Sequence, residues 1–529
     1  MTAPAAATHD HAPGRPRGPV RRPVLVATAV LVAAFAALPL GFVVAMTVDT
    51  GWSQTLDLVL RPRVGELLAN TVLLTVTAVP LSVALGVGGA WLVERTTLWG
   101  RRIWSLLLAA PLAVPAFVGS YGWVSAVPSL AGLWSGVLIA VLFYYPLVYI
   151  PVAAALSRLD PALEETAASL GLGRWAVFLR VVLPQLRLAA LGGAVLVALH
   201  LLAEYGAFAM IRFDTFTTAI MVQYQSTFNG TAGTMLAGVL AVLCLGLLAI
   251  ESLARGRARY ARVGSGALAR PTRIPLGGYQ IAAQAALLAL VAAALGLPLW
   301  FVLRWTARGW AQTAPDDLVE ALSTSFGYGA VTAGVTVAAA FPLAYLAVRQ
   351  PNPLTRALEA STYVSSAMPG IVIGLALVTV SIRAVPDLYQ SATVLVLAYV
   401  LLFLPRAAVG LRAGLAQAPV SLEEAARALG APPAAAFARI TLRLTAPASA
   451  AGAALVFLAV TNELTATLIL APNGTHTLAT EFWARSSEID YAGAAPYALT
   501  MVVLSLPTTY LLFRQSRRAA GRGGRSRSR

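Results

Sequence analysis

Long apolar runs alternate with short polar connections along almost the whole chain. A helix that crosses a bilayer needs about 20 mostly apolar residues, and twelve runs have this character. They are residues 24–46, 67–93, 103–127, 130–155, 188–210, 232–250, 281–303, 321–347, 360–382, 391–411, 447–470 and 494–513. Ten of these runs contain no acidic or basic residue apart from Arg406 near one end. The pattern predicts an all-α integral membrane protein with twelve membrane-spanning helices.

The basic residues between the runs indicate how the helices are oriented. All 38 are arginine and none is lysine, and the net charge is +16. With a cytoplasmic N-terminus, 31 arginines fall in inner segments and seven in outer ones. Cytoplasmic loops carry such an excess, so we predict a multi-pass protein of a bacterial inner or plasma membrane with both termini in the cytoplasm. Topology therefore explains the positive charge, and no nucleic-acid partner is predicted.

A repeated segment divides the chain into two halves. LEETAASLG at residues 163–171 returns as LEEAARALG at residues 422–430, 259 positions later. Six spans in each half make the repeats parallel, with a natural pathway between them. The predicted organisation is a disordered cytoplasmic tail over 1–22, a first six-span domain over 23–250, a cytoplasmic linker over 251–280, a second six-span domain over 281–514 and a basic cytoplasmic tail over 515–529.

The repeated segments lie in long inner loops, over residues 156–187 and 412–446, that carry helix signals. In the second loop, Ser421 and Glu424 have the spacing of a capping box, which predicts a helix that begins after Ser421. In the first loop, proline follows an acid at Asp160-Pro161, as at a helix start. Gly171 and Gly430 fit as C-terminal stops, and a second short helix is predicted from about Arg174 and Pro432.

The spacing of these loops resembles the EAA loop of binding-protein-dependent ABC importer permeases. The matching residues are Glu165-Thr166-Ala167, Gly171, Val181 and Leu183-Pro184 in the first copy, and Glu424-Ala425-Ala426, Gly430, Ile440 and Leu442-Arg443 in the second. The sequence departs from the pattern at Thr166, which replaces alanine, and at Arg443, which replaces proline. The resemblance implies the type I, MetI-like permease fold, with one permease domain in each half.

Within that family the chain most closely resembles the fused permeases of iron(III) uptake. The segments that carry this resemblance run from Glu204 to Thr217 and from Asn462 to Thr480. Fused permeases for thiamine or phosphonate share the architecture, so these substrates stay open as alternatives.

The resemblance also implies partners and coupling residues. Substrate would arrive on an extracytoplasmic binding protein, and a homodimer of ABC ATPases would dock on the two loops in the cytoplasm. The ATPase must be a separate subunit, because a P-loop needs a lysine that this chain lacks. One chain supplies both halves, so no further permease dimer is needed, and no cofactor is predicted. The residues predicted to couple to the ATPase are Glu164, Glu165, Ala167, Gly171, Glu423, Glu424, Ala426 and Gly430.

Few ionisable residues interrupt the apolar runs, and such residues usually face a cavity or a partner. Glu204 and Glu463 occupy equivalent positions in the two repeats. With Tyr205 and Asn462 they are predicted to line the translocation pathway, where carboxylates attract a hard cation. The alternative is a structural role, as an ion pair or as acids bonded to the backbone at helix ends. No resident metal site is predicted.

Two other classes of membrane protein compete with this interpretation. An ion-coupled secondary transporter can also have twelve spans in two parallel halves, but the duplicated loops argue against it. An integral membrane enzyme fits least, because the histidines, the single cysteine and the acids form no nucleophile or metal cluster in the sequence.

Overall fold

The computed structural model describes residues 23–521 apart from residues 158, 160, 227–229, 256–272 and 311–313. These residues form helices and turns, with one isolated backbone bridge between Thr96 and Ile274. The predicted tail over 1–22, most of the predicted linker and residues 522–529 lie outside the described residues. The fold class is therefore confirmed as all-α for the part of the chain that the structure describes.

The first half of the chain runs from α1 to α13. Its helices are α1 (Pro23–Thr50), α2 (Trp52–Val59), α3 (Pro62–Arg95), α4 (Arg101–Leu107), η1 (Ala110–Ala113), α5 (Ala116–Ala126), α6 (Gly132–Tyr144), α7 (Pro146–Leu156), α8 (Pro161–Ser169), α9 (Arg174–Val177), the π-helical turn η2 (Phe178–Val182), α10 (Leu183–Ala203), α11 (Gly206–Met210), α12 (Phe216–Gln225) and α13 (Gly230–Arg255).

The second half repeats this order, starting from its first span. Its helices are η3 (Gly277–Tyr279), α14 (Gln280–Val291), η4 (Ala292–Gly296), α15 (Leu297–Gly309), α16 (Pro315–Arg349), α17 (Pro353–Ala367), α18 (Gly370–Ala384), η5 (Pro386–Leu388), α19 (Ala392–Ala416), α20 (Val420–Ala428), α21 (Pro433–Ala436), the π-helical turn η6 (Phe437–Leu442), α22 (Arg443–Thr461), α23 (Thr465–Leu470), α24 (Leu478–Ser487) and α25 (Tyr491–Gly521).

All twelve predicted runs lie in helices, but not all of them form uninterrupted spans. Among the described residues, nine helices are long and apolar enough to cross a membrane, or ten if one bent pair is counted as a single span. The other two predicted runs contain shorter apolar helices, Gly370–Ala384 and Tyr491–Pro507. In addition, α25 continues to Gly521 without a break, so the predicted tail from residue 515 begins as helix.

Two predicted spans are broken at equivalent prolines. The third run bends by 94° between η1 and α5, where Val114 and Pro115 interrupt the helix. The ninth run breaks between α17 and α18 at Met368 and Pro369. Proline lacks the amide donor that a helix interior needs and restricts the residue before it, so both breaks have a local cause. Helices α3 and α16 nevertheless continue through Pro80 and Pro342, so proline alone does not decide the outcome.

Two further runs end earlier than predicted. The run over 188–210 was expected as one span, but α10 stops at Ala203 and α11 begins at Gly206. The run over 447–470 divides in the same way between α22 and α23. The interruptions contain Glu204 and Glu463, the acids singled out from the sequence. The break brings polar side chains and non-helical backbone into an otherwise apolar region, which membrane proteins tolerate where a cavity lies next to it.

The first span of each half packs against the other half. Helix α1 lies along α16 and α17, and the second half's first span, α14 to α15, lies against α5 and η1 of the first half. Gly122 of α5 and Pro298 of α15 are so close that a Cβ on Gly122 would lie 2.5 Å from the proline Cα. This exchange of helices joins the halves by packing as well as by the linker.

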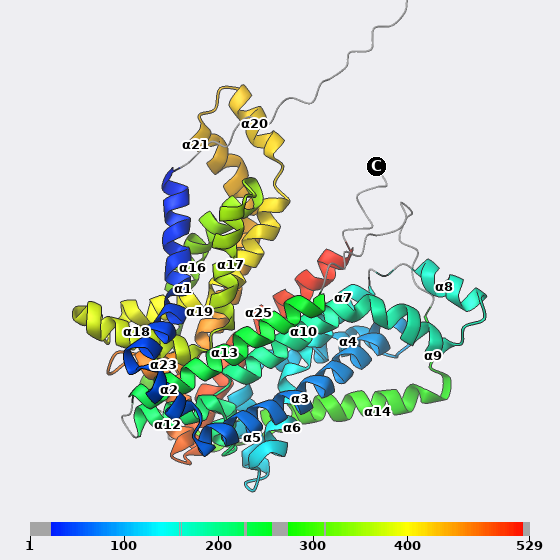
Figure 1. Cartoon of the computed structure of the whole chain (residues 1–529). Helices are drawn as coiled ribbons and strands as arrows, with labels where there is room; N and C mark the ends of the chain where they lie inside the picture. The colour runs from blue at the N-terminus through cyan, green and yellow to red at the C-terminus, as the bar shows by residue number, and fades with distance from the viewer. Residues whose placement is uncertain are drawn as a thin grey trace, which may run out of the picture.

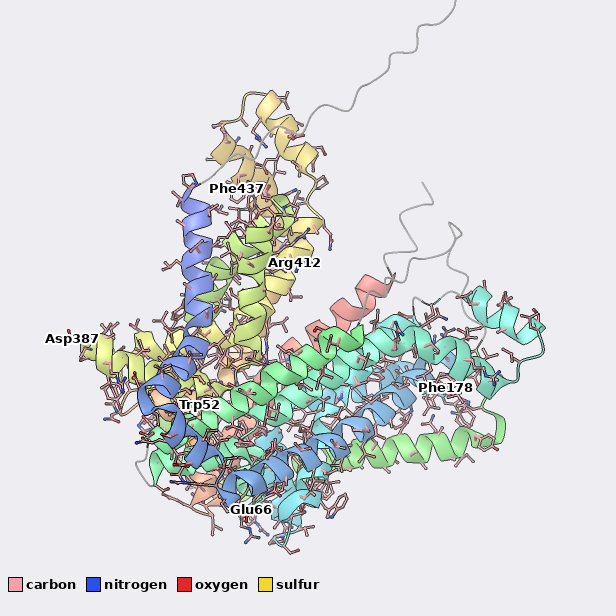
Figure 2. All side chains as sticks on the ribbon, viewed as in Figure 1. Trp52, Glu66, Phe178, Asp387, Arg412 and Phe437 are labelled. Atoms are coloured by element: carbon pink, nitrogen blue, oxygen red, sulfur yellow. The ribbon has the colours of Figure 1, made fainter. Side chains whose placement is uncertain are left out.

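The two groups of helices diverge toward the repeated loops (Figure 1). Helices α16, α17 and α19 form one group that ends at α20 and α21, and α3, α7 and α10 form another that ends at α8 and α9. Figure 2 labels the equivalent residues Phe178 and Phe437, which lie near the ends of the two groups. We call these ends the loop side of the molecule.

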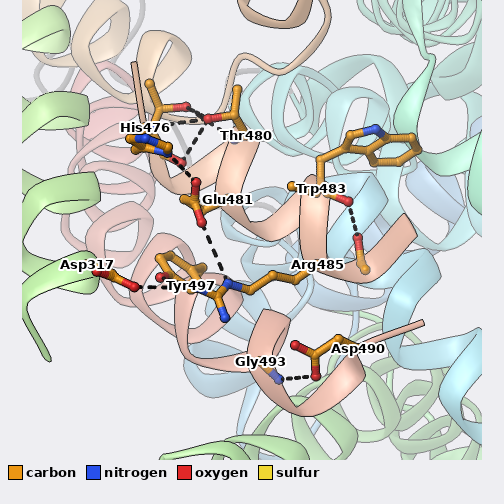
Figure 3. A network of polar contacts seen from close by, with 12 residues as sticks. Asp317, His476, Thr480, Glu481, Trp483, Arg485, Asp490, Gly493 and Tyr497 are labelled. Atoms are coloured by element: carbon orange, nitrogen blue, oxygen red, sulfur yellow. Dashed lines mark hydrogen bonds and ion pairs between the residues drawn. The ribbon is translucent and has the colours of Figure 1, made fainter. Parts of the chain in front are cut away.

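Polar clamps fix the opposite side, where α3 and α16 begin. In the second half, Arg485 of α24 contacts Asp317 and Glu481 at 3.7 and 3.6 Å, and its guanidinium lies 5.2 Å from the Tyr497 ring centre (Figure 3). In the first half, Arg63 of α3 pairs with Asp214 at 2.6 Å. Arg63 and Asp317 lie at the starts of the equivalent helices α3 and α16, but their partners Asp214 and Arg485 are not at equivalent positions.

Candidate functional site

A cavity of about 560 Å³ lies between the two halves, where α10 and α22 end. Its walls come from both repeats, and those of the second repeat include residues of α18 and α19. All four residues predicted for the pathway, Glu204, Tyr205, Asn462 and Glu463, line this one cavity. The sequence therefore identified residues from distant parts of the chain that the fold brings together, while their role in transport remains a prediction.

The two carboxylates each cap a short helix. The Ala207 amide donates a hydrogen bond of 2.8 Å to Glu204 Oε1, and the Ala466 amide donates one of 3.0 Å to Glu463 Oε1. Acids stabilise helix N-termini because they accept from amides that have no partner within the helix. This matches the structural alternative considered for these residues. It leaves lone pairs on each carboxylate for a ligand, since a carboxylate has about four acceptor sites.

The surroundings of the two carboxylates differ. Tyr144 of α6 donates a 2.5 Å hydrogen bond to Glu204 Oε2, whereas its equivalent 259 positions later, Phe403, has no hydroxyl. His200 Nδ1 lies 2.7 Å from the Leu196 carbonyl oxygen, so it carries the proton of that bond. The equivalent of His200 is Ala459. The two carboxylates of the cavity are therefore repeated, but the polar side chains next to Glu204 have no polar equivalents next to Glu463.

Arg406 of α19 also lines the cavity, and the sequence analysis did not assign it to the pathway. Its guanidinium carbon lies 5.0 Å from the centre of the Phe403 ring. The signal was present in the sequence, because Arg406 is the one basic residue within ten otherwise uncharged runs. Its position near the end of a run made it look like an inner-loop arginine, and it has no equivalent in the first repeat to draw attention to it.

The repeated loops fold as two short helices on the loop side. Helix α8 begins at Pro161, as predicted, and Asp160 lies outside the described residues. The predicted capping box of the second loop is wrong. Helix α20 begins at Val420 after Pro419, and no side chain caps it, so Ser421 already lies within the first turn. Proline fits this boundary because its fixed φ suits the start of a helix.

The predicted glycine stops have the expected geometry. Gly171 and Gly430 adopt φ of +85° and +89°, which favours glycine. The amide after each glycine bonds to the alanine carbonyl five residues earlier, from Leu172 to Ala167 at 3.2 Å and from Ala431 to Ala426 at 3.0 Å. These bonds are those of a Schellman motif. The glycines and the alanines of the repeated segment thus end both helices in the same way.

The first acid of each loop faces the body of the protein. Glu164 lies 2.8 Å from Arg95 at the end of α3, at ion-pair distance but without the alignment of a hydrogen bond. Burial raises the pKa of the Glu164 carboxyl, and Arg95 opposes that rise. Glu423 is buried and accepts a 2.8 Å hydrogen bond from Thr441 of η6. These acids therefore hold α8 and α20 in place by different partners.

The second acid of each loop, Glu165 or Glu424, is exposed. Ala167 is buried and Ala426 is half-buried. The eight predicted coupling residues thus divide into exposed acids, inward acids, alanines against the body and the glycines that end the helices.

Four exposed leucines on the same helices were not predicted as contact residues. Leu163 and Leu170 are 51% and 78% exposed, and their equivalents Leu422 and Leu429 are 47% and 89% exposed. Apolar side chains exposed at the same positions of two repeats indicate a surface that another protein covers. The signal was visible in the repeated segment, which begins with leucine and carries another before its final glycine.

Each loop returns to its half through an aromatic contact at a π-helical turn. Phe178 of η2 packs edge-on against Trp91 of α3, with ring centres 5.8 Å apart. Phe437 of η6 packs in the same way against Tyr345 of α16, also at 5.8 Å. The π-turn forms in both loops even though Arg443 replaces the proline of the first copy. A rigid connection from each loop to the long helix beside it follows from these contacts.

Searches among known proteins give a consistent result. The family model described as binding-protein-dependent transport system inner membrane component matches residues 78–254 and 330–521. The Fe(3+)-transport system permease protein FbpB 2 of Haemophilus influenzae is 35% identical over 480 residues, 90% of this chain and 95% of that protein. The sulfate transport system permease protein CysT of Escherichia coli is 29% identical over 42% of this chain and 88% of its own length. CysW of the same organism is 27% identical over 41% of this chain and 82% of its own length.

Proposed function

We propose that this chain, which belongs to the family of binding-protein-dependent transport system inner membrane components, is a permease. The proposed permease serves an ATP-driven importer of ferric iron. Members of this family are transport permeases of the membrane, so the chain is a multi-pass transport component and not an enzyme. The observation that carries the iron assignment is the 35% identity to an Fe(3+) permease over nearly the full length of both chains.

The cavity between the repeats is the proposed substrate pathway. It is lined by two carboxylates at equivalent positions, and hard oxygen ligands suit a hard cation such as Fe³⁺. Alternating access would open this cavity to one side of the membrane at a time, as the two groups of helices move relative to each other. The joining of the halves through exchanged first spans supports a concerted movement, because neither half can shift without its neighbour's helix.

The two loops are the proposed docking sites for a homodimer of ABC ATPases. Their helices end in identical motifs, present equivalent exposed leucines and connect firmly to α3 and α16. We assign direct contact to the exposed acids Glu165 and Glu424 and to the surface around Gly171 and Gly430. We assign a positioning role to Glu164 and Glu423, which brace the helices from behind.

The orientation follows from these assignments. Docking of a cytoplasmic ATPase places the loop side and both termini in the cytoplasm, in agreement with the arginine distribution. The substrate-binding protein then docks on the opposite side, where the Arg63 and Arg485 clamps lie. The division into permease domains over 23–250 and 281–514 is part of this proposal, with the first span of each packed on the other half.

Uptake of radiolabelled ferric iron tests the proposed function. Cells with and without the gene are compared, each with and without ATP depletion while the membrane potential is maintained. We expect gene-dependent uptake that disappears with ATP, because the driving force is ATP hydrolysis by the partner subunit. Uptake that survives ATP depletion would instead indicate a secondary transporter. Gene-dependent uptake of labelled sulfate, thiamine or phosphonate without iron uptake would contradict the iron assignment.

A substitution at the end of each loop helix tests the coupling assignment. Gly171→Asp or Gly430→Asp is expected to lower iron uptake about tenfold or more while the protein remains in the membrane. A Cβ at either position meets no atom within 4 Å, so the effect comes from backbone strain and charge on the docking surface. Gly→Asn is the matched control, because asparagine has nearly the same shape, tolerates positive φ and is uncharged. Uptake, ATPase activity and membrane abundance are measured together, and unchanged uptake in both aspartate variants would remove the coupling assignment.

A further inference from the structure

We propose that the inter-repeat cavity binds an oxyanion through the Arg406 guanidinium, so that ferric iron passes as a complex with an anionic oxygen ligand and not as the bare ion. The inference rests on the proposed function and specifies the chemical form of its substrate. It begins from an arginine that the coupling and pathway assignments leave unused.

Arg406 faces the cavity with its hydrogen-bond donors free. Arg406 belongs to α19, lines the cavity and is exposed. Its guanidinium carbon lies 5.0 Å from the centre of the Phe403 ring. Within the part of the chain that the structure describes, no oxygen accepts a hydrogen bond from it or forms an ion pair with it. A guanidinium has five donors in a planar fork, and a single aromatic contact satisfies none of them. The guanidinium therefore keeps its donors for a ligand, while Glu463 of the same cavity attracts it electrostatically without a hydrogen bond.

Three other sheltered arginines each lie beside an oxygen of the protein. Arg95 lies beside Glu164, and Arg349 donates a 2.9 Å hydrogen bond to the Ala418 carbonyl. Arg485 lies between two carboxylates. All three lie in the last turn of their helices, outside the predicted spans, whereas Arg406 lies within one. A charged side chain within a membrane span is costly unless it is paired, so an anionic ligand at the cavity wall would stabilise Arg406.

The cavity carries negative and positive side chains, which fits a substrate made of a metal cation and an anion. Glu204 and Glu463 retain lone pairs that suit the metal, whereas Arg406 repels a bare trivalent cation. An anion between the metal and the guanidinium removes this conflict, because its oxygens bind Fe³⁺ on one side and accept from Arg406 on the other. A planar guanidinium matches carboxylate and phosphate oxygens in pairs, so carboxylates, phosphate and carbonate form the expected class.

The size and asymmetry of the cavity agree with this interpretation. A volume of about 560 Å³ far exceeds that of one metal ion, given that a water molecule occupies about 30 Å³ in the liquid. The position equivalent to Arg406 in the first repeat is Leu147, so the positive group stands at one side of the cavity only. A complex with a metal end and an anion end would therefore bind in one orientation.

Direct anion binding to the purified full-length permease tests the inference apart from iron transport. Radiolabelled citrate, phosphate and bicarbonate are each titrated without iron against the wild type, Arg406→Gln and Arg406→Lys. We expect at least one anion to bind, with affinity reduced tenfold or more in Arg406→Gln and partly retained in Arg406→Lys. Arg304→Gln is the matched control, since Arg304 also lies over a phenylalanine three residues before it, at 5.8 Å, but outside the cavity lining.

Transport by the reconstituted complex of permease, ATPase and binding protein gives the second measurement. With ⁵⁵Fe supplied together with each labelled anion, we expect iron and one anion to accumulate together, and Arg406→Gln to lower both tenfold or more. The inference is overturned if none of the three anions binds, if Arg406→Gln binds as the wild type does, or if iron accumulates without any of them. A wild-type complex that binds an anion but transports no iron would instead overturn the iron assignment and leave the anion site standing.

Discussion

Replacing Leu170 and Leu429 together by aspartate is expected to abolish iron uptake, with a loss of roughly 100-fold or more in affinity for the ATPase. These leucines are 78% and 89% exposed at the ends of α8 and α20, the two proposed docking helices. Burying one leucine in an interface contributes about 1.5–3 kcal/mol. Two such losses amount to roughly two orders of magnitude or more in affinity, before the cost of burying a carboxylate is counted.

Co-purification of the ATPase with the permease measures this effect directly. Leu170→Met with Leu429→Met is the matched control, because methionine keeps the apolar surface at similar volume. Leu388→Asp supplies a second control. Leu388 is 38% exposed in η5, before the start of α19, whereas α20 follows the end of α19. If the double aspartate variant binds the ATPase as the wild type does, the leucines are not part of the docking surface.

Replacing Glu204 and Glu463 together by glutamine is expected to lower iron uptake tenfold or more while ATPase activity changes little. Glutamine keeps an oxygen that can accept from the Ala207 and Ala466 amides, so the helix caps remain. It removes both negative charges from the cavity, and with them the attraction for a hard cation. Uptake and ATPase activity are measured on the same reconstituted complex.

The alanine variants at the same two positions separate transport from stability. Glu→Ala removes the acceptor as well as the charge, and loss of a helix cap typically costs about 0.5–2 kcal/mol. We therefore expect both pairs of variants to transport poorly, and the alanine pair alone to lower the melting temperature of the permease. If the glutamine pair transports as the wild type does and only the alanine pair is destabilised, the carboxylates are structural caps.

Much of the candidate site was accessible from the sequence because the chain is duplicated. Glu204 and Glu463 stand 259 positions apart, as do the repeated loop segments, so an internal comparison separates them from ordinary polar residues. The same comparison found the glycines with positive φ, since only a left-handed stop explains glycine at that place in both copies. Arg406 escaped this comparison because it occurs in one repeat only.

Predictions from local spacing were weaker where the backbone had more than one way to begin or end a helix. Ser421 and Glu424 had the spacing of a capping box, yet α20 begins two residues earlier than predicted, at Val420, because Pro419 sets the boundary. The sequence also could not predict which of the loop acids point toward the body of the protein. Glu164 and Glu165 are neighbours, and only the packing of the loop helix on the fold, beside Arg95, shows that the first turns inward.

The sequence by itself determined the membrane class, the duplication and the residues repeated between the halves. These properties follow from local apolarity and from comparison of the chain with itself, and neither depends on which helices touch. The tertiary structure alone decided that α1 packs on the second half and that Arg406 lines the same cavity as both carboxylates. Those outcomes depend on contacts between residues far apart in the chain, where packing and the satisfaction of buried polar groups select one arrangement among many that the same apolar pattern allows.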